Sequence, residues 1–144
     1  MKKIFKGLFI FLFLILLSGC AKDYKEITST KFMEILKDEN GYLINTHTPI
    51  YDSNIEESIS ATGENVQFLF FEFGSKKEAK DYVENNYKNL KGYKYKDYGN
   101  YIEVRNTKTG YFYLIQIDKM VIRANSDIKS SKKEIKKIFK QLGY

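Results

Sequence analysis

Two stretches of the chain, residues 75–91 and 130–142, repeat their apolar residues every three or four positions, which is the spacing of one helix face. A third stretch, residues 30–40, begins and ends with the same types of residue as the other two. Each stretch starts at serine or threonine, whose hydroxyl accepts a backbone N–H at a helix start, and is followed by Gly-Tyr. Because glycine readily adopts the left-handed conformation that closes a helix, the pattern predicts three helices with these bounds.

Between these stretches the apolar positions recur with the period of two that is typical of strands. The predicted strands are residues 42–46, 58–62, 66–73, 101–105, 111–117 and 120–125. Residues 66–73 are apolar on both faces, which predicts a central strand covered on both sides. Short polar turns at 63–65, 106–110 and 118–119 predict three hairpins.

The predicted order of elements is α-β-β-β-α-β-β-β-α. Because hairpins pair their strands in an antiparallel way, the order predicts the α+β class, an antiparallel sheet with helices packed on one face. Residues 30–144 would form this single domain, and the short polar segment 20–29 would act as a tether.

Residues 1–19 have the three parts of a secretory signal peptide. Lys2, Lys3 and Lys6 precede ten consecutive apolar residues, 8–17, and the small residues Ser18 and Gly19 follow. A membrane-spanning helix needs roughly 20 apolar residues, so this segment is too short for a retained span. Removal of the leader lowers the formal net charge from +6 to +3, because the leader contains three lysines and no acidic residue.

The residues at the end of the leader, Leu17-Ser18-Gly19-Cys20, resemble the lipobox of bacterial lipoprotein precursors. The resemblance implies a diacylglyceryl group on the Cys20 thiol, cleavage before Cys20, and a lipid anchor at the outer face of the cytoplasmic membrane. Two acyl chains hold a protein stably at a bilayer. The body of the chain is similar to small lipid-anchored domains of Gram-positive bacteria, a resemblance that implies no activity.

Candidate catalytic and metal-binding residues are few. Cys20 and His47 are the only cysteine and histidine, which excludes the usual zinc ligand sets, and no serine lies in a nucleophile-elbow pattern. The acidic segment around Asp52 has Glu57 where a calcium-binding EF-hand loop needs glycine. We therefore predict no catalytic residue, no metal and no cofactor.

Four tyrosines alternate with lysines within residues 91–101. Tyr93, Tyr95, Tyr98 and Tyr101 are predicted ligand-binding residues, since tyrosine rings stack on sugars of wall polymers and anchor protein partners. Nucleic acid is not an expected partner outside the membrane. The alternative is an edge strand whose lysines discourage pairing with other chains.

The last predicted helix carries a run of lysines. Lys132, Lys133, Lys136, Lys137 and Lys140 are predicted to contact anionic lipid headgroups or wall polyanions. The alternative is an ordinary solvated helix face.

These observations favour a non-enzymatic binding or accessory lipoprotein at the cell surface, with a cell-wall polymer or a protein as partner. One alternative is an enzyme acting on wall or extracellular substrates through carboxylates such as Glu72 and Glu103, whose spacing only the fold can decide. Another is an immunity or exclusion lipoprotein.

Overall fold

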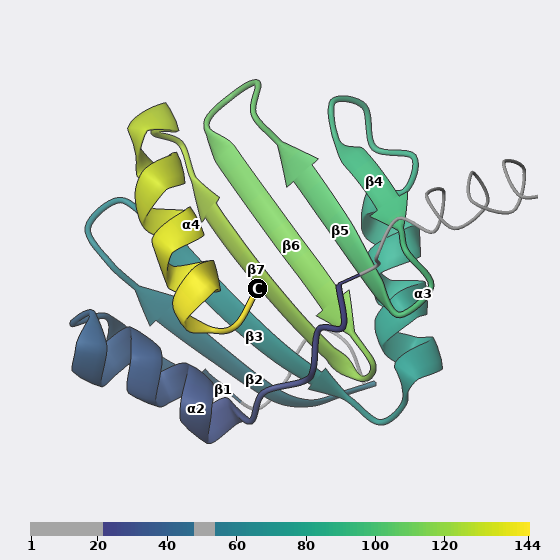
Figure 1. Ribbon diagram of the computed structural model, residues 1–144, viewed down its shortest axis with the longest axis horizontal. Helices are drawn as coiled ribbons and strands as arrows, with labels where there is room; N and C mark the ends of the chain where they lie inside the picture. The colour runs from purple at the N-terminus through teal and green to yellow at the C-terminus, as the bar shows by residue number, and fades with distance from the viewer. Residues whose placement is uncertain (1–21, 48–53) are drawn as a thin grey trace, which may run out of the picture.

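The computed structural model describes residues 22–47 and 54–144, which form an α+β domain with one seven-stranded antiparallel sheet in the order β1-β2-β3-β7-β6-β5-β4 (Figure 1). The strands are β1 (Leu43–His47), β2 (Ile55–Thr62), β3 (Gln67–Phe73), β4 (Lys94–Asp97), β5 (Tyr101–Asn106), β6 (Tyr111–Ile117) and β7 (Met120–Ser126). The helices are α2 (Ser29–Met33), which continues into the π-helical turn η1 (Glu34–Glu39), α3 (Lys76–Tyr87), and α4 (Lys132–Gln141), which follows the 3-10 turn η2 (Lys129–Ser131).

All three predicted hairpins are confirmed. Thr62 pairs with Gln67 in β2–β3, and Ile117 pairs with Met120 across the two-residue turn of β6–β7. β5 and β6 pair from Tyr101 with Ile117 to Asn106 with Phe112. The two halves of the sheet join in the middle, where β3 pairs with β7 along its length. This last pairing links strands that no short turn connects.

The predicted order of elements lacks one strand. Four strands follow α3 rather than three, because Lys94–Asp97 forms β4 and pairs with β5. The alternation of lysine and tyrosine hides this strand from a search for apolar periodicity. β4 is an edge strand, as the alternative interpretation of residues 91–101 predicted.

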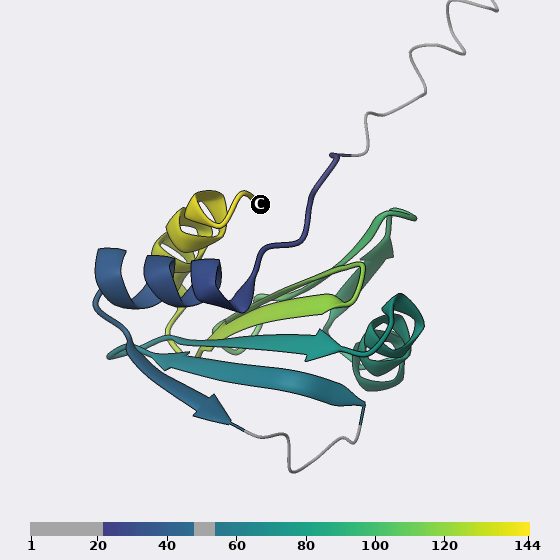
Figure 2. The same cartoon turned by 90° about the horizontal axis from the view of Figure 1, so that it is seen from below.

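The prediction that the helices cover one face is wrong, because α3 packs on the face opposite to α2 and α4 (Figure 2). Phe68 and Phe70 of β3 belong to the core beneath α2 and α4. Phe71 and Phe73 point to the other face, against α3. Successive side chains of a strand point to opposite faces, so the unbroken apolar run of β3 needs cover on both. The prediction of a doubly covered central strand is confirmed.

Local signals place the helix ends within a few residues. Thr28, not Thr30, caps α2 by accepting the backbone N–H of Lys31 at 3.2 Å. Ser75 caps α3 as predicted. The α3 helix ends at Tyr87, four residues before the predicted end. At the end of α4 the Tyr144 backbone N–H donates to the Phe139 carbonyl at 2.8 Å, which closes the helix at the predicted Gly-Tyr.

The polar segment before α2 is packed against the domain over its described part, residues 22–28. The Tyr24 ring lies edge-on to Tyr101 and Tyr144, with centroids 4.8 and 5.4 Å away. The Tyr144 hydroxyl donates to the Lys25 carbonyl at 2.7 Å, and the side chain of Asn100 donates to the Lys22 carbonyl at 2.8 Å. A tether would therefore be limited to residues before 22. The predicted signal peptide and Cys20 lie outside the described residues.

One ion pair attaches β4 to α3 and makes stability depend on pH. Lys80 Nζ lies 2.8 Å from Asp97 Oδ2, and the Gly99 backbone N–H donates to Asp97 Oδ1 at 2.8 Å. These bonds lower the pKa of the Asp97 carboxyl below its usual value of 3.8. A lowered folded-state pKa stabilises the fold above the unfolded pKa, and this contribution is lost as pH falls through the folded value.

We therefore expect Asp97→Asn to lower the melting temperature at pH 7 and to have a smaller effect at pH 2, because protonation of Asp97 at low pH removes the charge that the variant lacks. Thermal unfolding of wild type and variant at the two pH values measures the difference. An equal loss at both would mean that the shape of the side chain matters and its charge does not.

Candidate functional site

The lysines of α4 divide into two stripes, which face different neighbours. Lys132, Lys136 and Lys140 follow each other at four-residue intervals, so they share one side of the helix. Lys132 Nζ lies 5.8 Å from the centre of the Tyr111 ring, which directs this stripe toward β6. Lys133 and Lys137 form the second stripe, and Lys137 Nζ lies 3.5 Å from Asn40 Oδ1, beside η1. The five predicted contact residues therefore lie on two sides of α4.

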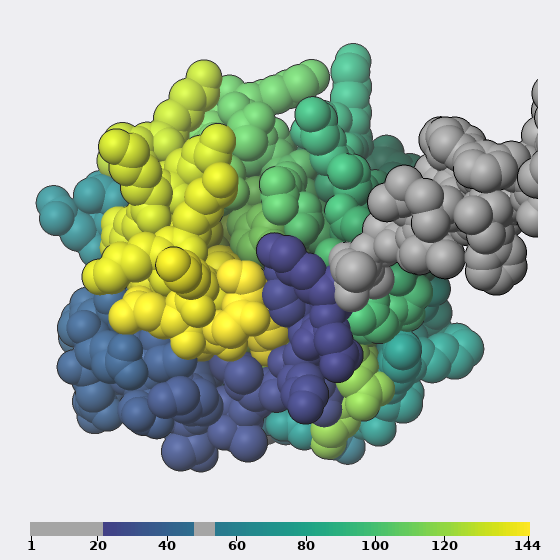
Figure 3. Space-filling model, viewed as in Figure 1, coloured from purple at the N-terminus to yellow at the C-terminus, as the bar shows by residue number. Residues whose placement is uncertain are grey.

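The first stripe borders a cavity of about 400 Å³ between α4, the strands β5 and β6, and residues 22–24. In Figure 3 green atoms of the sheet are visible beside the yellow C-terminal helix and above the purple N-terminal segment. The cavity, called here the Lys–Tyr cavity, is lined by four cationic side chains, Lys22, Arg105, Lys136 and Lys140. No acidic side chain is among the described residues that line it.

Aromatic rings form the walls of the Lys–Tyr cavity. These rings belong to Tyr24, Tyr111, Tyr113, Phe139 and Tyr144. Tyr113 packs edge-on against Phe139 with centroids 4.5 Å apart, and Phe139 is 2% exposed. Because these contacts belong to the main core, the walls are held in place without a ligand.

A buried carboxylate orients the arginine. Glu103 is 9% exposed and forms an ion pair with Arg105 Nε, while the Tyr113 hydroxyl donates to Glu103 Oε2 at 3.4 Å. The guanidinium lies 5.1 Å from the centre of the Tyr113 ring. Partial burial is the largest single effect on Arg105 and lowers its pKa, but the charges and hydrogen bonds of Glu103 and Tyr113 together outweigh it, so the pKa of the guanidinium is raised. Arg105 is thus a fixed cation with donors left for a ligand.

The tyrosine hydroxyls can act as neutral donors. Burial raises the pKa of Tyr111, Tyr113 and Tyr144, so all three remain protonated at physiological pH. Tyr113 donates to Glu103 and Tyr144 to the Lys25 carbonyl. In the described part of the chain the Tyr111 hydroxyl has no hydrogen-bond partner, and Lys136 and Lys140 form no ion pair. These three groups are available to an anion.

The structure does not bring the four predicted ligand-binding tyrosines together. Tyr93 packs in the core under α3, and Tyr95 donates to Glu84 of that helix at 3.1 Å. Tyr98 stacks on Tyr101 on the opposite face, with centroids 4.5 Å apart. Because successive side chains of a strand point to opposite faces, these two pairs of tyrosines lie on opposite faces of the sheet. Only Tyr101 lies near the Lys–Tyr cavity, through its contact with Tyr24.

The other candidate residues stand apart from one another. His47 ends the edge strand β1, and its Nε2 lies 3.0 Å from Ser60 Oγ. Glu72 pairs with Lys119, and its strand lies three positions from that of Glu103, or about 14 Å across the sheet. These two carboxylates are therefore not placed to act on one glycosidic bond. Within residues 22–47 and 54–144 no three acidic, histidine or cysteine side chains form a metal-binding group.

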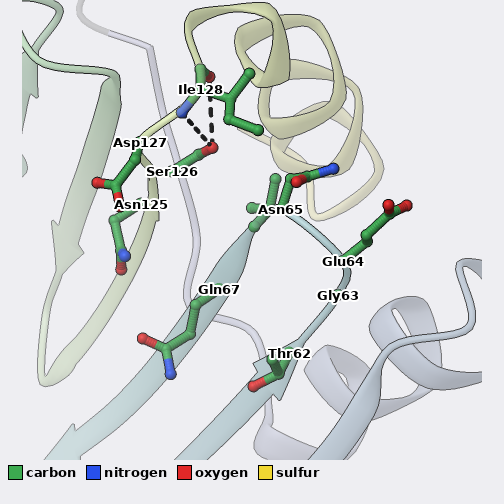
Figure 4. Close-up of a pocket in the computed structure, with 10 residues that line it drawn as sticks. Thr62, Gly63, Glu64, Asn65, Gln67, Asn125, Ser126, Asp127 and Ile128 are labelled. Carbon is green, nitrogen blue, oxygen red and sulfur yellow. Dashed lines mark hydrogen bonds between the residues drawn. The ribbon is translucent and has the colours of Figure 1, made fainter.

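A second, polar cavity of about 320 Å³ lies at the end of the sheet between the β2–β3 turn and the segment after β7 (Figure 4). The Ser126 hydroxyl is already occupied there, accepting the Ile128 N–H at 3.1 Å and lying 3.0 Å from Ser131 Oγ. The side chains of Gln67 and Asn125 point away from Ile128 in Figure 4. The polar groups of this cavity do not converge, so the Lys–Tyr cavity is the better candidate.

Comparison with known proteins gives information on the fold alone. No protein-family model and no curated protein matches the sequence. Among solved structures, a GTP-binding regulator from Thermotoga maritima has a TM-score of 0.53 and 11% identity, with 78% of this chain and 84% of that chain covered. At this identity the likeness shows a shared α+β architecture.

Sequence reasoning missed most of the Lys–Tyr cavity. It selected Lys136 and Lys140, but not Lys22, Arg105 or Tyr111. One signal was present: Arg105 is one of two arginines in a lysine-rich chain, and it follows an acidic residue on the same strand face.

None of the helices in the described part of the chain is long and apolar enough to cross a membrane.

Proposed function

We propose that this protein is a lipid-anchored surface lipoprotein that acts as a non-enzymatic binding module, and that its Lys–Tyr cavity accepts a small anionic group. The observation that carries the proposal is the convergence of Arg105, Lys136 and Lys140 on one cavity, which has no acidic lining residue. Anions of the phosphate or carboxylate type match these donors, because charge-assisted hydrogen bonds are among the strongest that side chains form.

The geometry of the donors favours phosphate over a simple carboxylate. Arg105 offers a planar fork, and Lys136 and Lys140 of α4 add two mobile point charges to the same cavity. The Tyr111 hydroxyl adds a neutral donor. The aromatic walls would contact the organic part of a phosphate ester, as tyrosine and phenylalanine rings do with apolar groups. A phosphate ester thus uses both kinds of surface that the cavity contains.

The anchor rests on the resemblance of residues 17–20 to a lipobox. It would place the domain outside the cell, where phosphate esters occur in lipid headgroups and in wall polymers. A binding role also agrees with the separate positions of His47, Glu72 and Glu103, none of which meets another of these candidate groups within residues 22–47 and 54–144.

The test is a titration of the chain from residue 21 onward with glycerol 3-phosphate. Binding is measured from the NMR shifts of labelled tyrosine rings. Both core clusters lie within residues 24–144, so this chain is expected to fold. The double variant K136Q/K140Q should bind at least tenfold more weakly, since each lost charge-assisted contact is worth about 1.5–3 kcal/mol.

The matched control is K133Q/K137Q, which removes the same charge from the other side of α4. This variant should bind within twofold of wild type and show the same ring shifts. If wild type does not bind the probe, or if both double variants weaken binding equally, the cavity is not an anion site.

A further inference from the structure

The N-terminal segment determines which way the Lys–Tyr cavity faces. Lys22 lines the cavity, and its backbone carbonyl accepts a hydrogen bond of 2.8 Å from Asn100. The Tyr24 ring is wedged between Tyr101 and Tyr144. The chain is therefore attached to the domain as far back as Lys22. Lys22 lies only two positions after Cys20, and two residue steps span at most about 7 Å.

This short distance would bring the mouth of the cavity to the membrane surface once Cys20 carries its lipid. A domain on a long tether can rotate freely, but one attached this closely presents the face from which its chain emerges. The emerging face is the one that bears Lys132, Lys136 and Lys140. Acidic groups near this face include Asp23, beside Lys22, and Glu103, which is already paired with Arg105. Glu26 of the same segment also lies nearby, and it accepts the Lys119 backbone N–H at 3.0 Å.

We infer that the ligand of the Lys–Tyr cavity is the phosphate of an anionic phospholipid headgroup in the membrane that holds the anchor. This inference rests on the proposed function and names its ligand. Such a headgroup combines a phosphodiester, which the cations bind, with a glycerol unit that packs on the rings. Tyrosine also favours the headgroup level of a bilayer, where the ring is apolar and the hydroxyl is hydrated.

Net charge provides the selectivity. Phosphatidylglycerol and phosphatidylcholine both contain a phosphodiester, but choline adds a quaternary ammonium group. Lys22, Lys136 and Lys140 would repel that ammonium, and no acidic side chain lines the cavity to accept it. An anionic headgroup is therefore expected to bind and a zwitterionic one to be rejected.

The experiment uses the full lipidated protein, expressed with its leader, extracted in mild detergent and mixed with equal amounts of phosphatidylglycerol and phosphatidylcholine. Native mass spectrometry counts the phospholipid retained on each chain. We expect one phosphatidylglycerol per chain, retained at least tenfold over phosphatidylcholine. K136Q/K140Q should lower this retention at least tenfold, while K133Q/K137Q should keep it within twofold.

Several outcomes would overturn the inference. If the two double variants lose phosphatidylglycerol retention equally, the lipid is held by diffuse charge attraction and not by a specific site. Equal retention of the two lipids would exclude selectivity for anionic headgroups. If the deacylated headgroup, glycerophosphoglycerol, binds as tightly as the lipid, the ligand is a free phosphate ester. If polyglycerol phosphate displaces the lipid and binds more tightly, the ligand is a wall polymer.

The two levels of proposal fail in different ways. If glycerol 3-phosphate binds in a way that depends on Lys136 and Lys140, but phosphatidylglycerol is not retained, the anion site is supported and phospholipid is excluded as its ligand. If neither compound binds, the anion site itself is excluded.

Discussion

Cys20→Ala is expected to abolish the lipid anchor and with it the stable attachment of the mature chain to the membrane. Cys20 carries the only thiol in the chain, so no other residue can form the thioether. Each buried CH₂ contributes about 0.8 kcal/mol to membrane binding, and two acyl chains make the attachment stable. Without them only the cationic face remains, at about 1 kcal/mol per charge, and salt screens that attraction.

Membrane fractionation at low and high salt, with mass spectrometry of the N-terminal peptide, measures the effect. Wild type should carry a diacylglyceryl group on Cys20, and the variant should be an unprocessed precursor or a released chain. Ser18→Ala is the matched control, because it keeps a small residue at that lipobox position and should be processed like wild type. A Cys20→Ala chain that is mature in size and resists high salt in the membrane fraction would contradict the proposal that the protein is a lipoprotein.

Gly110→Ala is expected to destabilise the domain more than any other single methyl addition to a glycine of the described chain. Gly110 has a φ of +134°, and a Cβ there would lie 2.1 Å from the Ser126 carbonyl oxygen and 2.9 Å from Asp127 Cα. Both contacts are with backbone, so no side chain can move aside. Strain in this region costs about 1–3 kcal/mol, and overpacking costs about 1–3 kcal/mol.

The expected total of about 2–6 kcal/mol is a large part of the usual 5–15 kcal/mol of folding stability. Urea unfolding of the chain from residue 21 measures it. Gly99→Ala is the control, since Gly99 also has a positive φ, +86°, but nothing lies within 4 Å of its added Cβ. That variant should lose only about 1–2 kcal/mol. Equal losses would mean that the β5–β6 turn relaxes away from β7.

Local patterns predicted the elements whose causes are local. The β6–β7 hairpin follows from two alternating runs and a two-residue turn, and the structure has β6 with the predicted bounds. The failed capping prediction has a tertiary cause. Ser131 fits a capping box in sequence, yet its hydroxyl bonds to Ser126, while the carboxylate of Glu134 accepts from the Tyr42 hydroxyl. Contacts with residues outside the helix therefore replace the capping hydrogen bonds that the sequence predicts.

The candidate site needed information that no local pattern contains. Lys136 and Lys140 line the same cavity as Arg105 because Phe139 of α4 packs against Phe68 of β3 and Tyr113 of β6. This packing sets which side of α4 borders β5 and β6. A rotation of α4 by one residue would bring the Lys133 stripe to the cavity in place of the Lys136 stripe. The sequence shows which residues are charged, but it does not show how α4 is rotated about its axis.

By itself, the sequence determined the α+β class, the hairpins and the position of the helices, because periodicity and turn residues act over a few neighbouring positions. The tertiary structure alone decided that α3 covers the second face, that residues 22–28 pack on the sheet, and that two of the predicted lysines join Arg105 at a cavity. These features depend on which apolar faces cover one another, and such packing is settled between segments far apart in the chain.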